Sequence, residues 1–177
     1  AGLASRFASL ANLRNHSPLL RRLFERFAGI SARRALPAFR SDVFAPPVEA
    51  VGPESGREVV LFADTFNRIY ERENLDAALR VLAAGGYRVH LPKPASGSRP
   101  LCCGRTFLSA GLVEEARAEA RRVIDTYAPF VARGVPVIGL EPSCLLAFRD
   151  ELPSLLPGEA TQRLAAHVGA RAQVIGI

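Results

Sequence analysis

The chain has 177 residues, 49% of them hydrophobic, with a net charge of +6, three cysteines and no methionine or tryptophan. This composition is typical of one globular domain with an appended segment, and no apolar run approaches the ~20 residues of a membrane span. The sequence shows no secretory signal pattern, and three cysteines cannot all pair within one chain. We therefore expect a reducing, cytoplasmic setting. Because the chain opens on Ala1 and ends on the strand-like QVIGI, we expect it to be a piece of a longer polypeptide.

The positive charge is concentrated at the N-terminus. Residues 1–40 contain eight arginines and one acid, which gives +7, whereas the remainder sums to −1. Two helices are expected here, at 1–15 and from Pro18 to a stop at Gly29. Phe7, Phe24 and Phe27 recur at helical spacing with leucines, which predicts a buried face. We therefore expect an Arg-rich helical arm that packs on its own protein, and no nucleic-acid partner.

Strands and helices alternate in the rest of the chain. Residues 41–56 are rich in Pro and Gly and are predicted to form a linker, and 57–177 a domain. Strands are expected at 58–64, 87–92, 135–141 and 172–177, and helices at 74–86, 112–134, 143–152 and 161–169. This alternation predicts an α/β fold, with a parallel sheet covered by helices on both faces.

Five chemically capable side chains follow three of these predicted strands: Asp64, Cys102, Cys103, Glu141 and Cys144. In open parallel sheets, sites form beyond the carboxyl ends of the strands, so neighbouring strands would bring all five to one edge. Cys144 lies in the first turn of its helix, whose expected cap is Ser143. There the helix dipole stabilises a thiolate. Soft thiolates suit iron–sulfur clusters, zinc or copper.

Structural roles compete with these chemical ones. Free cysteines are often small buried hydrophobic residues. Asp64 is also a suitable N-cap for a helix from Thr65, and Glu141 a loop carboxylate stabilised by a helix N-terminus. The sequence contains no phosphate-binding loop, no GxGxxG and no GxSxG nucleophile motif, which leaves no other motif of that kind to explain the domain.

Further residues beside the cysteines are candidate pocket residues. Gly104 lets the backbone after Cys103 bend without a side chain in the way. Arg105 and Thr106 can contact an anionic substrate or a quinone head group, or can be ordinary helix-entry residues. Asn67 and Arg68 either face the same pocket or lie on the surface.

The segments LCCG (101–104), AGLVEEAR (110–117) and PSC (142–144) resemble the cysteine-rich CCG domain. That family includes the cysteine-rich subunit of heterodisulfide reductase and the iron–sulfur subunits of glycolate and lactate oxidases. The resemblance covers roughly residues 58 to 153. Residues 10–39 also resemble the connector of fused bacterial proteins that join a flavin-linked dehydrogenase half to an iron–sulfur half.

The resemblance implies a five-residue ligand set for an iron–sulfur cluster. Thirty-seven residues separate Asp64 from Cys102, and 37 separate Cys103 from Glu141. Cys102, Cys103 and Cys144 occupy cysteine positions of the family, whereas Asp64 and Glu141 stand where the family has cysteines. Carboxylates are harder ligands, which weaken a sulfur-rich cluster or favour another metal such as zinc.

Three functions remain open at this point. The first is an electron-transfer domain of a flavin-linked 2-hydroxy-acid dehydrogenase, without complete activity by itself, whose FAD lies in a missing part of the chain. Its implied partners are the flavin-dehydrogenase region and a quinone or another electron acceptor, in the cytoplasm or peripheral to the inner membrane. The second is a cofactor-less docking domain of the same assembly. The third is a thiol–disulfide relay between Cys144 and Cys102 or Cys103.

Overall fold

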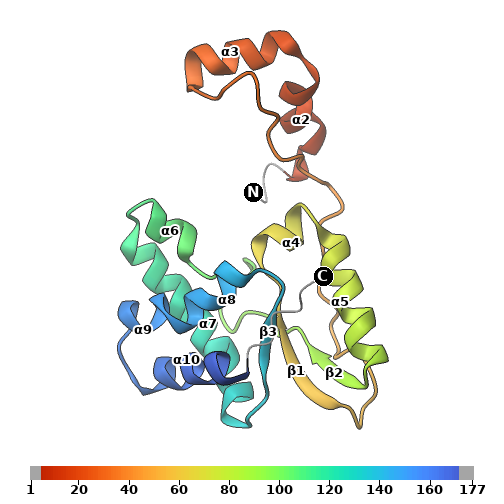
Figure 1. Ribbon diagram of the computed structural model, residues 1–177, viewed down its shortest axis with the longest axis vertical. Helices are drawn as coiled ribbons and strands as arrows, with labels where there is room; N and C mark the ends of the chain where they lie inside the picture. The colour runs from red at the N-terminus through yellow and green to blue at the C-terminus, as the bar shows by residue number, and fades with distance from the viewer. Residues whose placement is uncertain (1–4, 172–177) are drawn as a thin grey trace.

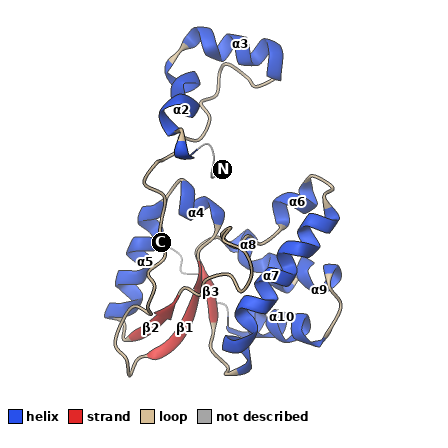
Figure 2. Ribbon diagram, turned by 180° about the vertical axis from the view of Figure 1, so that it is seen from behind, coloured by secondary structure: helices blue, strands red, loops and turns tan. Residues whose placement is uncertain are grey.

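A computed structural model describes residues 5–171 of the chain, and its centre is a parallel sheet in the order β2–β1–β3 (Figure 2). The strands are β1 (Arg57–Phe62), β2 (Tyr87–His90) and β3 (Val137–Gly139). Val59 is paired with Val89 on one side of β1, and Val60 with Val137 on the other. The carboxyl ends of all three strands therefore lie at the same edge.

Helices cover both faces of this sheet, as the alternation of strands and helices predicts (Figure 1). Val59 and Leu61 of β1 pack with α5 (Arg72–Ala84) in one core. Val60 and Phe62, on the opposite face, pack with α7 (Val113–Ala132) and α8 (Pro142–Arg149) in another. Successive side chains of a strand point to opposite faces, so one apolar strand serves both cores.

The remaining helices are short or peripheral. They are α2 (Ala8–His16), α3 (Pro18–Ala28), α4 (Thr65–Ile69), α6 (Arg105–Ser109), α9 (Glu151–Leu155) and α10 (Glu159–Arg171). The helix expected over 143–152 is in fact divided between α8 and α9. Pro153 explains this break, because a continuous helix would need an N–H at that position to bond the carbonyl of Arg149. In α9, Pro153 lies in the first turn, where no such bond is required.

The N-terminal arm projects away from the sheet (Figure 1). The prediction that its apolar face is buried is wrong. Phe7 is 60% exposed, Phe27 is 80% exposed, and α3 has no buried residue. Polar contacts hold the arm together instead: Asn12 exchanges two hydrogen bonds with the backbone of Phe39. Because α3 lies in the projecting arm, away from both cores of the domain, its apolar side chains have no hydrophobic surface to pack against.

The segment 41–56 packs closely on the domain that follows it. Phe44 is buried in the α5 core, and its N–H donates to the carbonyl of Arg68. Val51 forms an antiparallel bridge with Val89 of β2. The strand expected at 172–177 lies outside the described residues. None of the helices within 5–171 combines the length and apolar character that crossing a bilayer demands.

Candidate functional site: a thiol cluster at the carboxyl edge of the sheet

The loops that follow the three strands meet at the carboxyl edge of the sheet. Asp64 lies two residues beyond β1, Cys102 and Cys103 lie in the loop after β2, and Glu141 lies two residues beyond β3. Cys144 is the third residue of α8, in its first turn. Because β1 lies between β2 and β3, the connections bring segments 80 residues apart in sequence to one place.

The closest contact in this region joins two cysteines. The Sγ atoms of Cys103 and Cys144 are 3.2 Å apart, and both residues are buried in the α7–α8 core. Cys102 is half-buried, and its thiol is hydrogen-bonded to Cys103 and to the hydroxyl of Thr65. All three cysteines are free thiols. Burial and mutual contact therefore isolate the Cys103–Cys144 pair from solvent, and Cys102 lies on its outer side.

The surroundings favour the protonated form of the two adjacent thiols. The pKa of Cys102 is raised well above its ordinary value by the contact with Cys103 and by burial. For Cys103, the contact with Cys102 lowers the pKa, but the neighbouring Cys144 thiol and burial outweigh it and raise the pKa to about 11. At neutral pH these two thiols therefore carry protons in the metal-free protein.

A buried carboxylate on α7 holds the cysteine loop, the segment before α6 that carries Cys102 and Cys103. Glu119 is fully buried, and its Oε1 accepts a hydrogen bond of 2.7 Å from the N–H of Cys102. Its two oxygens also accept from Arg122 at 2.9 Å, and Arg99 completes the ion-pair network. Sequence reasoning missed Glu119. Its place among Ala116, Ala120 and Val123 on the apolar stripe of α7 is the signal that could have found it.

Gly104 gives the loop its bend. Its φ is +83°, a left-handed conformation that glycine adopts without strain, and it is the N-cap of α6. A Cβ at this position would lie 3.4 Å from the carbonyl oxygen of Ala116. The loop therefore turns tightly against α7, as the adjacent Cys-Cys-Gly sequence suggested.

Asp64 is the N-cap of α4. Its Oδ1 accepts from the N–H groups of Phe66 and Asn67 at 2.9 and 3.0 Å, and its Oδ2 accepts from the side-chain amide of Asn67 at 2.7 Å. Asn67 in turn accepts from Asn74. The carboxylate is fully buried, and both its oxygens are engaged in these bonds. Ligation of a metal by Asp64 would cost part of this cap, and its role as a ligand stays a prediction.

Glu141, rather than the expected Ser143, is the N-cap of α8. Its Oε1 accepts from the Ser143 N–H at 3.2 Å and from the Ser143 hydroxyl at 2.5 Å. Pro142 occupies the first helical position, which suits proline because proline has no N–H that would need a partner there. The helix therefore begins one residue after Glu141. A ligand role for Glu141 likewise stays a prediction.

The candidate pocket residues do not all share one cavity. Arg68 and Thr106 line a cavity of about 800 Å³ together with Cys102. Asn67 is buried in the Asp64 network, and Arg105 is exposed, with its guanidinium 3.5 Å from the carbonyl of Ser143. Burial lowers the pKa of Arg68, and nothing among residues 5–171 offsets that effect with an opposite charge. Two of the four polar pocket candidates therefore face the thiol-lined cavity.

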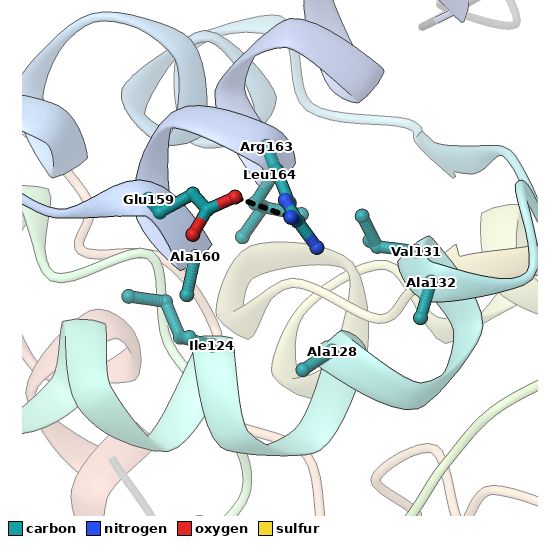
Figure 3. Close-up of a pocket in the computed structure, with 8 residues that line it drawn as sticks. All are labelled: Ile124, Ala128, Val131, Ala132, Glu159, Ala160, Arg163 and Leu164. Atoms are coloured by element: carbon teal, nitrogen blue, oxygen red, sulfur yellow. Dashed lines mark hydrogen bonds and ion pairs between the residues drawn. The ribbon is translucent and has the colours of Figure 1, made fainter.

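A separate cavity of about 210 Å³ lies between α7 and α10 (Figure 3). Its wall is mostly apolar, with Ile124, Ala128 and Leu164 among the lining side chains, and the Glu159–Arg163 ion pair spans one side. None of the predicted site residues lines it. We assign this space to the packing of α10 on α7.

The donor chemistry fits an iron–sulfur cluster at three of the five implied positions. Cys102 and Cys103, in one loop, and Cys144, in the first turn of α8, offer soft sulfur ligands that meet. Within residues 5–171, however, no group of three or more His, Cys, Asp or Glu side chains is arranged to hold a metal ion. The three thiols are in contact with one another through Cys103, and a bound cluster would therefore require their side chains to rearrange around it.

Comparison with known proteins identifies a similar oxidoreductase component. No family profile and no solved structure matches the chain. The chain is 27% identical over 154 residues to a subunit of the anaerobic glycerol-3-phosphate dehydrogenase of Escherichia coli K12, and equally to the same subunit of strain O157:H7. The match covers 85% of this chain and 38% of the relatives' length. The chain is thus similar to one part of a dehydrogenase subunit, and the finer resemblance to the CCG domain stays a prediction.

Proposed function

We propose that this chain is an electron-transfer domain of a flavin-linked dehydrogenase assembly, with Cys102, Cys103 and Cys144 as its redox-active residues. The observation that carries the proposal is the 3.2 Å approach of Cys103, in the loop after β2, and Cys144, in the first turn of α8. The similarity to part of a glycerol-3-phosphate dehydrogenase supports a place in such an assembly. No step of substrate oxidation is assigned to this chain.

The substrate of the assembly is proposed to be a small 2-hydroxy acid such as lactate or glycolate, as the CCG resemblance implies. The relatives are named for glycerol-3-phosphate. Both kinds of molecule are small, anionic and carry an alcohol, so the two indications agree on the chemistry that a flavin region would perform. That region and its FAD would lie outside the present sequence.

An iron–sulfur cluster, when bound, would accept and release single electrons at this edge of the sheet. The residues of this chain would hold it and shape its surroundings. The three thiols would be the ligands, and Gly104 and Glu119 would fix the loop that carries two of them. The buried side chains of Leu101 and Leu145 would limit water around the sulfurs.

The partners follow from the same scheme. A flavoprotein region would donate electrons, and a quinone or another acceptor would receive them. The exposed apolar side chains of the arm, which include Leu19, Leu23 and Phe27, are a suitable contact for the flavoprotein. Arginines on the same helix would allow that contact to pair with carboxylates.

Iron and acid-labile sulfide analysis after anaerobic reconstitution tests the proposal. We expect iron and sulfide to bind to the wild-type chain and to be largely lost in Cys103→Ser and Cys144→Ser. Asp64→Asn tests the implied carboxylate ligand separately, because Asn keeps an N-cap while removing the charge, and iron content equal to wild type would leave the three thiols as the ligands. Wild-type protein without iron or sulfide would overturn the cluster proposal.

A second candidate function is favoured by the same sulfur pair. The reduced flavin of the partner would pass two electrons, with two protons, to a Cys103–Cys144 disulfide, and reoxidation of the two thiols to the disulfide would pass both electrons and both protons to the acceptor. Redox-active thiols in iron-free protein would favour this relay. If Cys103→Ser and Cys144→Ser bind iron and transfer electrons as wild type does, the cysteines have no redox role and the chain is instead a docking domain.

A further inference from the structure

The cavity beside Cys102 is lined by residues of the arm, of the segment after it and of the sheet edge. Its volume is about 800 Å³, within the range of small-molecule sites. The arm and the segment after it contribute Ser5, Arg6, Ser41 and Val43. The helices α4 and α6 and the cysteine loop contribute Thr65, Arg68, Ile69, Arg99, Pro100, Cys102, Thr106 and Phe107. Apolar and polar side chains thus share the wall.

Positive charge dominates this wall, and part of it has no counter-charge. Arg99 is paired with the buried Glu119. Arg68 is half-buried, and within residues 5–171 its guanidinium has no ion pair or hydrogen bond. A half-buried cation without a partner is costly unless an anion accompanies it. Arg6, which lines the same cavity, is likewise without a carboxylate partner in the described residues.

An unpaired hydroxyl provides an independent indication of a ligand. Ser5 lines the cavity and is only 5% exposed, and its Oγ has no hydrogen-bond partner in the part of the chain that the structure describes. Buried polar atoms in native proteins are nearly always hydrogen-bonded, so an orphan in a cavity wall marks a place for a ligand atom. Thr65 and Thr106 add hydroxyl groups to the same wall.

The apolar part of the wall limits what the ligand can be. Val43, Ile69, Pro100 and Phe107 line the same space as the arginines. An inorganic ion would leave this surface in contact with water. A ligand with an anionic group and a small apolar body would satisfy both parts.

We propose that this cavity, which Arg6, Arg68 and Cys102 line, binds an organic anion: a carboxylate or a phosphate monoester on a small apolar body. The proposal concerns binding alone. It holds whether or not the cysteines bind iron, so its failure and that of the proposed function would be separate results.

Calorimetric titration of the purified chain with three probes tests this proposal. The probes are 3-phenylpropionate, phenyl phosphate and the neutral 3-phenylpropanol. We expect saturable binding of at least one anion and at least tenfold weaker binding of the alcohol. Preference for the carboxylate or the phosphate would identify the source of the anion. No saturable binding of either anion, or equal binding of the alcohol, would overturn the proposal.

Three charge variants locate the binding. Arg68→Gln should weaken anion binding at least tenfold, whereas Arg80→Gln removes the same charge from the exposed face of α5 and should change nothing. Arg6→Gln lies on an exposed position, so it tests the same wall if Arg68→Gln fails to fold. Unchanged anion binding in Arg6→Gln together with Arg68→Gln, or equal loss in Arg80→Gln, would overturn the assignment to this cavity.

Discussion

Cys103 and Cys144 are 41 residues apart in the sequence, and their sulfur atoms lie 3.2 Å apart at the carboxyl edge of the sheet. The contact depends on the order of the strands, because β1 lies between the strands that precede the two cysteines. It also depends on how the cysteine loop turns against α7 and on how α8 begins. Each of these supports can be tested separately.

Glu119→Gln should destabilise the protein by about 2–3 kcal/mol. The buried carboxylate accepts hydrogen bonds from Cys102 and Arg122, and bonds to a charged group contribute ~1.5–3 kcal/mol. Urea unfolding measures the change. Glu115→Gln, exposed on the same helix, is the control and should lie within about 0.5 kcal/mol of wild type. Equal effects of the two substitutions would contradict a supporting role for Glu119.

Gly104→Ala should cost about 1–2 kcal/mol, because the residue has a φ of +83° and a side chain there is strained. The added Cβ also meets the carbonyl of Ala116 at 3.4 Å. Gly158→Ala is the control, since a Cβ there meets no atom within 4 Å. Thermal unfolding should show a clear loss for the first variant alone. A stable Gly104→Ala protein would mean that the loop does not adopt this left-handed turn.

These residues also show what the sequence could predict. The alternation of apolar runs with amphipathic helices was enough for the α/β fold and for the edge where the loops meet. The roles of Asp64 and Glu141 were not decided by spacing, because a carboxylate one or two residues before a helix suits both a cap and a metal. Glu119 was missed because one acid among the four on a long helix looks like a surface residue until its partners are known. The arm was misjudged because helical periodicity shows that a face is apolar and does not show what covers it.

Replacing both capping carboxylates with the family's cysteines separates capping from ligation. Asp64→Cys and Glu141→Cys should each lower the free energy of unfolding of the metal-free protein by about 1 kcal/mol, because a cap is lost. The double variant should bind more iron per chain after anaerobic reconstitution. Asp125→Cys, which adds a cysteine at an exposed position of α7, is the control and should not increase the iron bound. If the double variant gains no more iron than this control, the two positions do not face the thiols.

The stability of the metal-free protein should fall at alkaline pH. The pKa of Cys103 is about 11 in the folded chain against 9.0 for the ordinary thiol, so between these values the unfolded state loses its proton first. The free energy of unfolding contributed by this group is therefore constant below pH 9 and declines toward pH 11. Cys102 and Tyr127 act in the same direction. Cys103→Ser should make the decline shallower in urea titrations at several pH values, and an unchanged slope would contradict the raised pKa.

Disulfide mapping after mild oxidation tests the central geometry most directly. Iron-free protein is treated with diamide under native conditions, alkylated and digested, and the linked peptides are identified by mass spectrometry. The account predicts an intramolecular bond between Cys103 and Cys144, with Cys102 alkylated as a free thiol. Linkage of separate chains, or three free thiols after oxidation, would contradict a shared site.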